Sequence, residues 1–320
     1  MALTDNISSK GWGTMRRYVS TEADYTLDTR PERPGKRGIL LERTKTIKSG
    51  DYLECEIFPM VLMEPGIREA RRKRTPEQMR EINRRNAVKK LERLMNANFT
   101  AGDLMPHLTM DRPCSFEEMQ KIVRNFFQRL RRLAAKRGAV LRYIYVIETK
   151  QEHGQQRHHL HGIISARPAQ GPSAQLPHAA GARLSCACGP SAVNLISRDE
   201  IEKLWGHGLA RVDRVQQQEK GLAGFARYIT QQKTTQERLM RRNWGASKGL
   251  RQPTVTVADH KFSRAAAAKI ARDLEGDART ILEKKYPGYR LIEQPVIRYS
   301  DWLPGCYVYA FLERIKTETE

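Results

Sequence analysis

Residues 141–148 read LRYIYVIE and residues 157–165 read RHHLHGIIS, and the hydrophilic run TKQEHGQQ at 149–156 separates them. Both outer segments are rich in the β-branched and aromatic residues that are typical of strands. The short polar run between them is typical of a turn. The stretch therefore predicts a β-hairpin, and the rest of the domain is expected to be built around it.

The second strand of this hairpin carries a pair of histidines. Side chains two positions apart on a strand point to the same face of a sheet, so His159 and His161 are expected side by side. Glu148 ends the preceding strand, from which its carboxylate can reach the two rings. Two imidazoles and a carboxylate suit Mg²⁺ or Mn²⁺ better than a closed zinc site. Histidine pairs with this spacing are also common as structural residues, and the spacing alone leaves that alternative open.

Helix signals surround the hairpin. Thr75 and Pro76 predict a helix that begins at Pro76, within a strongly basic run. Ser115 is the expected N-cap of a second helix, which ends near Arg137, and Ser197 caps a short third one. The order strand, helix, hairpin, helix, strand, helix favours the α+β class, with a central antiparallel sheet that carries the histidines and is flanked by helices.

Composition divides the chain into parts with different characters. The run at 166–194 is rich in Ala, Pro, Gly and Ser, and it is expected to be a loop inserted after a core strand. The parts are a β-rich N-terminal extension at 1–60, a basic helix at 61–97, the central domain at 98–250, and a C-terminal α/β extension at 251–320.

The charge of the chain points to an anionic partner. Lys and Arg number 57 against 36 Asp and Glu, which gives a formal net charge of +21. Nucleic acid is the expected partner, because each phosphate that a basic side chain neutralises releases counterions. The chain has no apolar run long enough to cross a membrane and its first residues lack the layout of a signal peptide, so we expect a cytoplasmic protein.

Tyr228 is the candidate nucleophile. It lies in GLAGFARYITQQK, residues 221–233, which predicts a helix with the small residues Ala223 and Gly224 about one turn before the tyrosine. A phenol with a pKa of about 10 attacks phosphorus only when a base or a metal assists. A single aromatic on an amphipathic helix is more often part of a core, and the helix pattern alone does not decide between these roles.

Three motifs occur in order along the chain: HLTM at 107–110, HHLHG at 158–162 and ARYITQQ at 226–232. Together they resemble the HUH endonuclease superfamily, which is named for two histidines around a bulky hydrophobic residue. More closely, the chain is similar to the replication-associated proteins of phages and integrative elements that are related to filamentous-phage gene II protein. The similarity extends over roughly residues 70–290.

The resemblance implies a role for each matching residue. His159 and His161 would bind Mg²⁺ or Mn²⁺, with Glu148 as the acidic third ligand. Tyr228 would attack the scissile phosphate of single-stranded or hairpin origin DNA, keep the 5′ end covalently and leave a 3′ hydroxyl for a host polymerase. Thr109 lies in the first motif, which contacts DNA or supports the sheet. The chain contains no P-loop sequence, so unwinding would fall to a host helicase.

One position departs from the pattern of these relatives. They carry a lysine three residues after the tyrosine, where this chain has Gln231. Lys233 is the nearest lysine that follows, but on an ideal helix it is rotated by about 140° from the tyrosine. Arg227, just before the tyrosine, offers charge from another direction. These three residues are the candidate DNA contacts of the helix.

Two other interpretations stay open from the sequence. A single-tyrosine transposase or a mobilisation relaxase would share this chemistry. A basic DNA-binding protein with structural histidines would bind nucleic acid in a salt-sensitive manner without cleaving it. The oligomeric state is not predicted.

Overall fold

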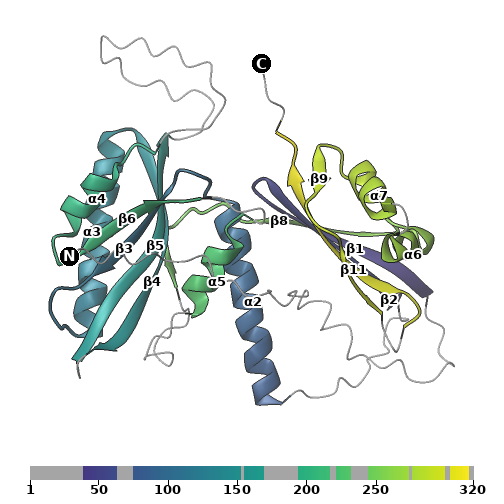
Figure 1. Ribbon diagram of the computed structural model, residues 1–320, viewed down its shortest axis with the longest axis horizontal. Helices are drawn as coiled ribbons and strands as arrows, with labels where there is room; N and C mark the ends of the chain where they lie inside the picture. The colour runs from purple at the N-terminus through teal and green to yellow at the C-terminus, as the bar shows by residue number, and fades with distance from the viewer. Residues whose placement is uncertain are drawn as a thin grey trace, which may run out of the picture. The chain divides into compact units, whose positions relative to one another are not determined.

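The computed structural model describes residues 39–62, 75–152, 155–168, 194–216, 221–231, 244–273, 276–299 and 303–316 (Figure 1). These residues fall into two compact units, which are described separately. The first unit contains residues up to Ile47, Leu53–Ile82 and the chain from Val255 on. The second contains Lys48–Tyr52 and Asn83–Thr254.

The second unit is built on a five-stranded antiparallel sheet with the order β6-β3-β5-β4-β7. Its strands are β3 (Leu104–Thr109), β4 (Ala139–Glu152), β5 (Gln155–Pro168), β6 (Ala210–Arg214) and β7 (Gly245–Ala246). The predicted hairpin is present as β4 and β5, in which Glu148 pairs with His159. Because β5 continues to Pro168, the part of the expected loop that remains, 169–193, lies outside the described residues.

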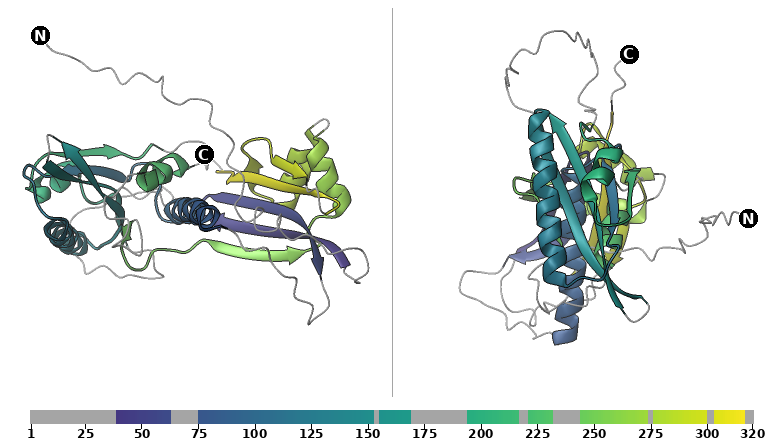
Figure 2. Two further views of the ribbon diagram at one scale, coloured as in Figure 1. Left: turned by 90° about the horizontal axis from the view of Figure 1, so that it is seen from below. Right: turned by 90° about the vertical axis from the view of Figure 1, so that its left-hand side faces the viewer.

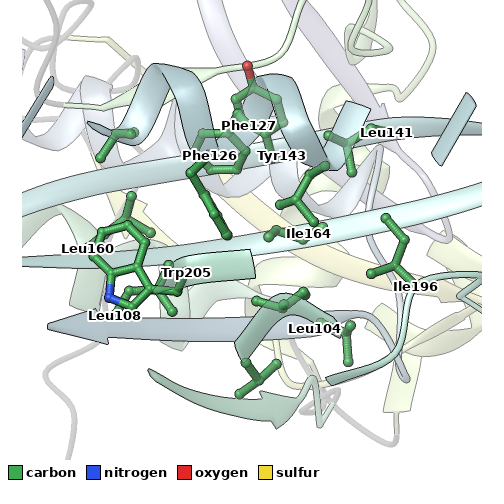
Figure 3. Close-up of a cluster of buried hydrophobic side chains, with 14 of the residues drawn as sticks. Leu104, Leu108, Phe126, Phe127, Leu141, Tyr143, Leu160, Ile164, Ile196 and Trp205 are labelled. Atoms are coloured by element: carbon green, nitrogen blue, oxygen red, sulfur yellow. The ribbon is translucent and has the colours of Figure 1, made fainter. Parts of the chain in front are cut away.

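Two helices cover one face of this sheet, as Figure 1 and the right-hand view in Figure 2 show: α3 (Phe116–Lys136) and α4 (Arg198–Trp205). Ser115 caps α3 and accepts a hydrogen bond from the backbone N–H of Glu118. The apolar stripe of α3 packs on the sheet, and Phe126 meets the ring of Trp205 edge-on at 5.5 Å between centroids (Figure 3). This core holds β5 in place from the face of the sheet that α3 and α4 cover.

The opposite face of the sheet is the one that carries the HxH pair. The C-terminal part of α2 (Pro76–Asn96) and the short α5 (Ala223–Gln231) pack there. The buried side chains of both helices pack against strand residues on this face. The cluster that they form together includes Leu91, Leu94, Met95, Ala226, Ile144, Val146 and Ile163. The helix that begins at Pro76 is therefore confirmed, and its last turns pack against the sheet that bears the site.

The first unit contains a six-stranded sheet with the order β10-β11-β2-β1-β8, and β9 also pairs with β11. The strands are β1 (Ile39–Ser49), β2 (Tyr52–Leu62), β8 (Thr254–Asp259), β9 (Tyr289–Leu291), β10 (Val296–Tyr299) and β11 (Cys306–Arg314). Two helices, α6 (Arg264–Arg272) and α7 (Asp277–Lys285), pack on one face (Figure 2). Strands from both ends of the chain thus share one sheet, whereas the sequence analysis treated 1–60 and 251–320 as separate extensions.

The predicted fold class is confirmed: the chain is α+β, with antiparallel sheets flanked by helices. No helix in the described part of the chain is long and apolar enough to span a bilayer. The assignment of the chain to four parts by composition stays a prediction.

Candidate active site

Strand register brings the motifs together. On β3 and β5, Thr109 pairs with His159 and His107 pairs with His161. On the other side of β5, Glu148 of β4 pairs with His159. Paired residues share a face, so the HxH pair, Glu148, His107 and Thr109 lie on the face that α5 covers.

The centre of the site is the ring of His161, which joins two other groups. Its Nε2 lies 2.9 Å from Oε2 of Glu148, and its Nδ1 lies 3.1 Å from the phenolic oxygen of Tyr228. The tyrosine ring stands nearly perpendicular to the imidazole, at 85° and 5.2 Å between centroids. Tyr228 is 42% exposed, so its phenol meets the site without being part of the core.

The helix that carries Tyr228 is held at its start by the end of α2. The side-chain oxygen of Asn96 accepts a hydrogen bond of 2.9 Å from the backbone N–H of Leu222. Gly221, with φ at +65°, leads into this turn, and a Cβ there would lie 2.6 Å from the same Asn96 oxygen. Only glycine fits such a close approach. The junction fixes where α5 begins and therefore where Tyr228 points.

The other two histidines of the HHLH run have different surroundings. Nδ1 of His159 lies 3.1 Å from the Thr109 hydroxyl. His158 points to the opposite face, where it contacts the Thr149 hydroxyl at 2.9 Å and the Cys114 carbonyl at 3.0 Å. His158 is therefore fixed within the α3 side of the sheet, and Thr109 orients His159.

Burial sets the protonation of the site. It lowers the pKa of His161 to about 4, with the neighbouring His107 adding to the effect while Glu148 opposes it. Burial also lowers the pKa of His107. His161 is therefore neutral at pH 7, the form that binds metals. Burial, and then the charge of Glu148, raise the pKa of Tyr228, so the phenol keeps its proton in these surroundings.

Residues 103–233 match the family model of the replication-associated proteins ORF2 and gene II protein. The match covers about two fifths of the chain, from just before β3 to just after α5, and so it includes the histidines, Glu148, Thr109 and Tyr228 of the site. It supports assignment of this region to a family of rolling-circle replication initiators. Comparison with curated proteins finds no match. Comparison with solved structures finds none either.

Within the region that the family model matches, the sequence analysis missed His107. Its ring stacks on His161 at 4.2 Å between centroids and lies 5.7 Å from the ring of His159. Its Nε2 is buried and has no hydrogen-bond partner among the described residues. The available signal was the spacing of His107 and Thr109, which places both side chains on one face of β3.

Lys150 is a second residue that the sequence analysis did not single out. It lies two positions after Glu148 on β4, and its Nζ is 3.4 Å from Oε2 of Glu148. Of the predicted DNA contacts, Arg227 lies half-buried on α5, while the side chain of Gln231 and all of Lys233 lie outside the described residues. The structure thus brings Glu148, His159, His161, Thr109 and Tyr228 together and adds His107 and Lys150.

No three His, Cys, Asp or Glu side chains of the described residues already surround one point as a metal site would. His161 and Glu148 are hydrogen-bonded directly to each other, so their polar atoms do not point together at a third position. His159 is the more distant member, with its ring centroid 6.5 Å from that of His161. All the donors nevertheless lie on one face of three adjacent strands.

Proposed function

We propose that the chain nicks one strand of DNA with Tyr228, assisted by Mg²⁺ or Mn²⁺, and thereby initiates rolling-circle replication of a phage or mobile element. The observation that carries this proposal is the contact of 3.1 Å between the Tyr228 phenol and His161, whose other ring nitrogen meets Glu148. A phenol, an imidazole and a carboxylate from three separate elements converge in the region that the replication-associated family model matches.

The spacing of the donor atoms fits a divalent cation. Two adjacent ligand atoms of an octahedral site with bonds of about 2.1 Å lie about 3 Å apart. The 2.9 Å between Nε2 of His161 and Oε2 of Glu148 agrees with that spacing. We propose His159, His161 and Glu148 as ligands and His107 as a further donor, because its buried Nε2 has no hydrogen-bond partner among the described residues.

The hydroxyl contacts of the two HxH rings support the same arrangement. Histidines that bind a metal usually donate their other ring N–H to an oxygen. Nδ1 of His159 meets the Thr109 hydroxyl, and Nδ1 of His161 meets the Tyr228 phenol. Both rings would then bind through Nε2. A bound cation would polarise the phosphate and stabilise the charge that develops on its oxygens.

The chemical step is a transesterification. The phenolic oxygen of Tyr228 forms a bond to phosphorus, and the bond between phosphorus and the 3′ oxygen breaks. The tyrosine loses its proton, and the departing 3′ oxygen gains one to become a hydroxyl. The 5′ end stays on the protein as a phosphotyrosine, and reversal of the step by a 3′ hydroxyl rejoins the strand.

His161 is placed to act on the phenol proton. With Nε2–H donating to Glu148, Nδ1 accepts the hydrogen bond of Tyr228 and can receive its proton. With Nε2 engaged as a ligand, Nδ1–H donates to the phenolic oxygen and stabilises a phenolate. The two tautomers differ in their need for a cation, so a chelator separates them: we expect EDTA to abolish nicking.

We further propose that Lys150 supplies the charge that relatives place after the tyrosine. Its Nζ reaches the site from β4, where its charge also lowers the pKa of His107. Its side chain is 47% exposed, which leaves it open to a DNA phosphate. Arg227, Gln231 and Lys233 remain proposed contacts along the strand, and Thr109 is proposed to act through His159.

The deciding experiment uses a labelled single-stranded or hairpin origin DNA with Mn²⁺, followed by denaturing electrophoresis. The native chain should give a nicked product and a covalent protein–DNA adduct. Tyr228→Phe should abolish the adduct and keep DNA binding, and Tyr299→Phe is the matched control because Tyr299 is an exposed tyrosine on β10 of the other unit. An adduct from Tyr228→Phe would overturn the nucleophile assignment.

The same assay separates the other interpretations. Salt-sensitive binding with no cleavage in any metal would identify a DNA-binding protein with structural histidines. Excision and joining of paired element ends would instead identify a transposase. The proposed partners, a host helicase and a host DNA polymerase, are tested by extension of the released 3′ hydroxyl in a reconstituted reaction.

A further inference from the structure

A cavity of about 260 Å³ lies within the second unit, where β4 begins and β5 ends. The turn between β1 and β2, the end of α2 with the turn that follows it, and the segment before β8 complete its wall. Three of the lining residues are arginines, Arg142, Arg167 and Arg251, and Asp51 is the acidic one. The cavity is therefore a concentration of positive charge away from the tyrosine.

Arg167 is held in place by buried partners. Its Nη2 lies 2.8 Å from Oδ1 of Asp103 and 2.6 Å from the Thr100 hydroxyl. Asp103 is 0% exposed, and its second oxygen accepts the backbone N–H of Thr100 at 2.9 Å. Nε of Arg167 is buried and has no hydrogen-bond partner among the described residues. A guanidinium held by such partners is preorganised to bind an anion.

The main chain at Arg251 is also fixed. Its backbone N–H donates to the side-chain oxygen of Asn98 at 2.8 Å, and its carbonyl accepts from the Asn98 amide at 2.9 Å. The same amide reaches the carbonyl of Leu94 in the last turns of α2 at 2.8 Å. Arg251 thus lines the cavity from a backbone that Asn98 holds on two sides.

Arg142 is the third guanidinium, and its side chain makes no hydrogen bond or ion pair with the described residues. It lies half-buried on β4. Burial lowers the pKa of Arg142, and the positive charges of Arg251 and Arg167 lower it further. A bound anion would relieve this repulsion by adding negative charge beside the three guanidinium groups.

The cavity and the nicking site share one face of the sheet. Arg142 precedes Glu148 by six residues on β4, and Arg167 follows His161 by six on β5. Even separations keep side chains on one face, and six residues of strand span about 20 Å. That length corresponds to about six nucleotides at the rise of B-DNA, and to fewer in an extended strand.

We propose that this cavity binds a backbone phosphate of the DNA strand whose scissile phosphate lies at Tyr228. The inference rests on the proposed function for the identity of the strand. The chemistry fits a phosphodiester, because planar guanidinium groups match phosphate oxygens in pairs. The volume is below the roughly 300–1,000 Å³ of sites for drug-sized ligands, so the cavity suits a phosphate group rather than a whole nucleotide.

The test measures binding of single strands of increasing length in the Tyr228→Phe chain, so that no strand is consumed. The double variant Arg142→Gln/Arg251→Gln removes two charges and leaves the buried pair of Arg167 and Asp103 intact. The matched control is Arg129→Gln/Arg132→Gln, which removes two exposed charges from α3 on the opposite face. Thermal melting confirms that all variants are folded.

We expect long strands to bind the double variant at least about tenfold more weakly than the control. The slope of log affinity against log salt should fall by about 0.7, since the cavity contacts one phosphate of the single strand. Short strands limited to the nick should bind the double variant and the control equally.

Equal affinities and slopes for the double variant and the control on long strands would overturn the inference. A loss that is the same for short strands would also overturn it, because the arginines would then act at the nick. Inorganic phosphate should raise the melting temperature of the Tyr228→Phe chain more than that of the double variant. Equal increases would overturn the assignment of the cavity as an anion site. If the native chain does not nick DNA, the proposed function is contradicted but the cavity inference is not. The dependence of binding on strand length and on salt is measured without any cleavage.

Discussion

His161 contacts Tyr228 through one ring nitrogen and Glu148 through the other, while His107 stacks on its face. A substitution of any of these neighbours therefore acts on the same imidazole. The contributions of a bound cation, of a general base and of a nearby positive charge to nicking can be separated only by variants that change one of them at a time.

His107 provides such a variant for the cation. We expect His107→Asn to weaken Mn²⁺ binding about tenfold, as the loss of a supporting or outer ligand does at other metal sites. Electron paramagnetic resonance of the free Mn²⁺ in a titration measures this without any turnover. His260→Asn, in the other unit, is the matched control. Unchanged Mn²⁺ affinity in His107→Asn would show that His107 only packs on His161.

Lys150 provides a variant for the charge. Lys150→Met should lower the nicking rate about tenfold to a hundredfold, because a cation that contacts a reacting phosphate stabilises its transition state. Lys150→Arg should retain most of the rate. Single-turnover kinetics with pre-bound DNA distinguishes this from weaker binding. A Lys150→Met chain that nicks at the native rate once DNA is saturating would rule out a role in the step itself.

Part of the site could be predicted at this scale. The spacing of His159 and His161 has a local geometric meaning, Glu148 ends the preceding strand, and Tyr228 stands in a motif that resembles the family, so the sequence predicted that these four residues lie together. His107 matters because of its neighbours on an adjacent strand, and its position depends on register between segments about 50 residues apart, which is not local information. Lys150 lies two positions after Glu148 on β4, so its place on the same face follows from strand spacing alone.

Among the elements, the helix starts were the most readable features. Ser115 and Ser197 cap α3 and α4 as predicted, since capping involves residues within one turn of each other. The hairpin of β4 and β5 was readable for the same reason. The pairing of β1 and β2 with β8 and β11 was not, because it joins segments about 200 residues apart through backbone groups that every sequence possesses.

The start of α4 gives a prediction about acid stability. Hydrogen bonds from Arg137, and then from the backbone of Ser197, lower the pKa of Glu200 to about 2. A lowered folded-state pKa stabilises the protein fully above the ordinary value of 4.5, and this stabilisation is lost as the pH falls toward about 2.

Glu200→Gln should therefore lower the melting temperature at pH 7 by roughly 2 °C, and the difference from the native chain should shrink below pH 4.5. Thermal melts across this pH range measure it. Glu202→Gln, an exposed position on the same helix, is the control. A deficit in Glu200→Gln that is constant down to pH 2 would show that the carboxylate charge is not responsible.

At the scale of the whole chain, each unit has its own apolar core. Leu312 lies 0% exposed in the core of the first unit, and Leu130 is equally buried on the inner face of α3 in the second. Truncation of a fully buried leucine to alanine costs about 2–5 kcal/mol. Because the two clusters share no member, the two truncations should act on different units.

Leu312→Ala should lower one unfolding transition in differential scanning calorimetry, and Leu130→Ala should lower another. Nicking at 25 °C, where both variants remain folded, should persist in Leu312→Ala. A single transition that both substitutions shift by the same amount would show that the two units unfold as one.

The first unit's sheet takes strands from both sides of the segment that forms the second, and this has a consequence for synthesis. When the ribosome has completed β7, every strand of the second unit's sheet exists, but β1 and β2 still lack β8 and β11. At about 5–20 residues per second, the 68 residues from the end of β7 to the end of β11 take roughly 3–14 s to appear. The first two strands must wait through that interval with their apolar side chains unburied. Ribosome-bound chains arrested after β7 should therefore resist protease in the β3–β7 region while being cleaved within β1 and β2.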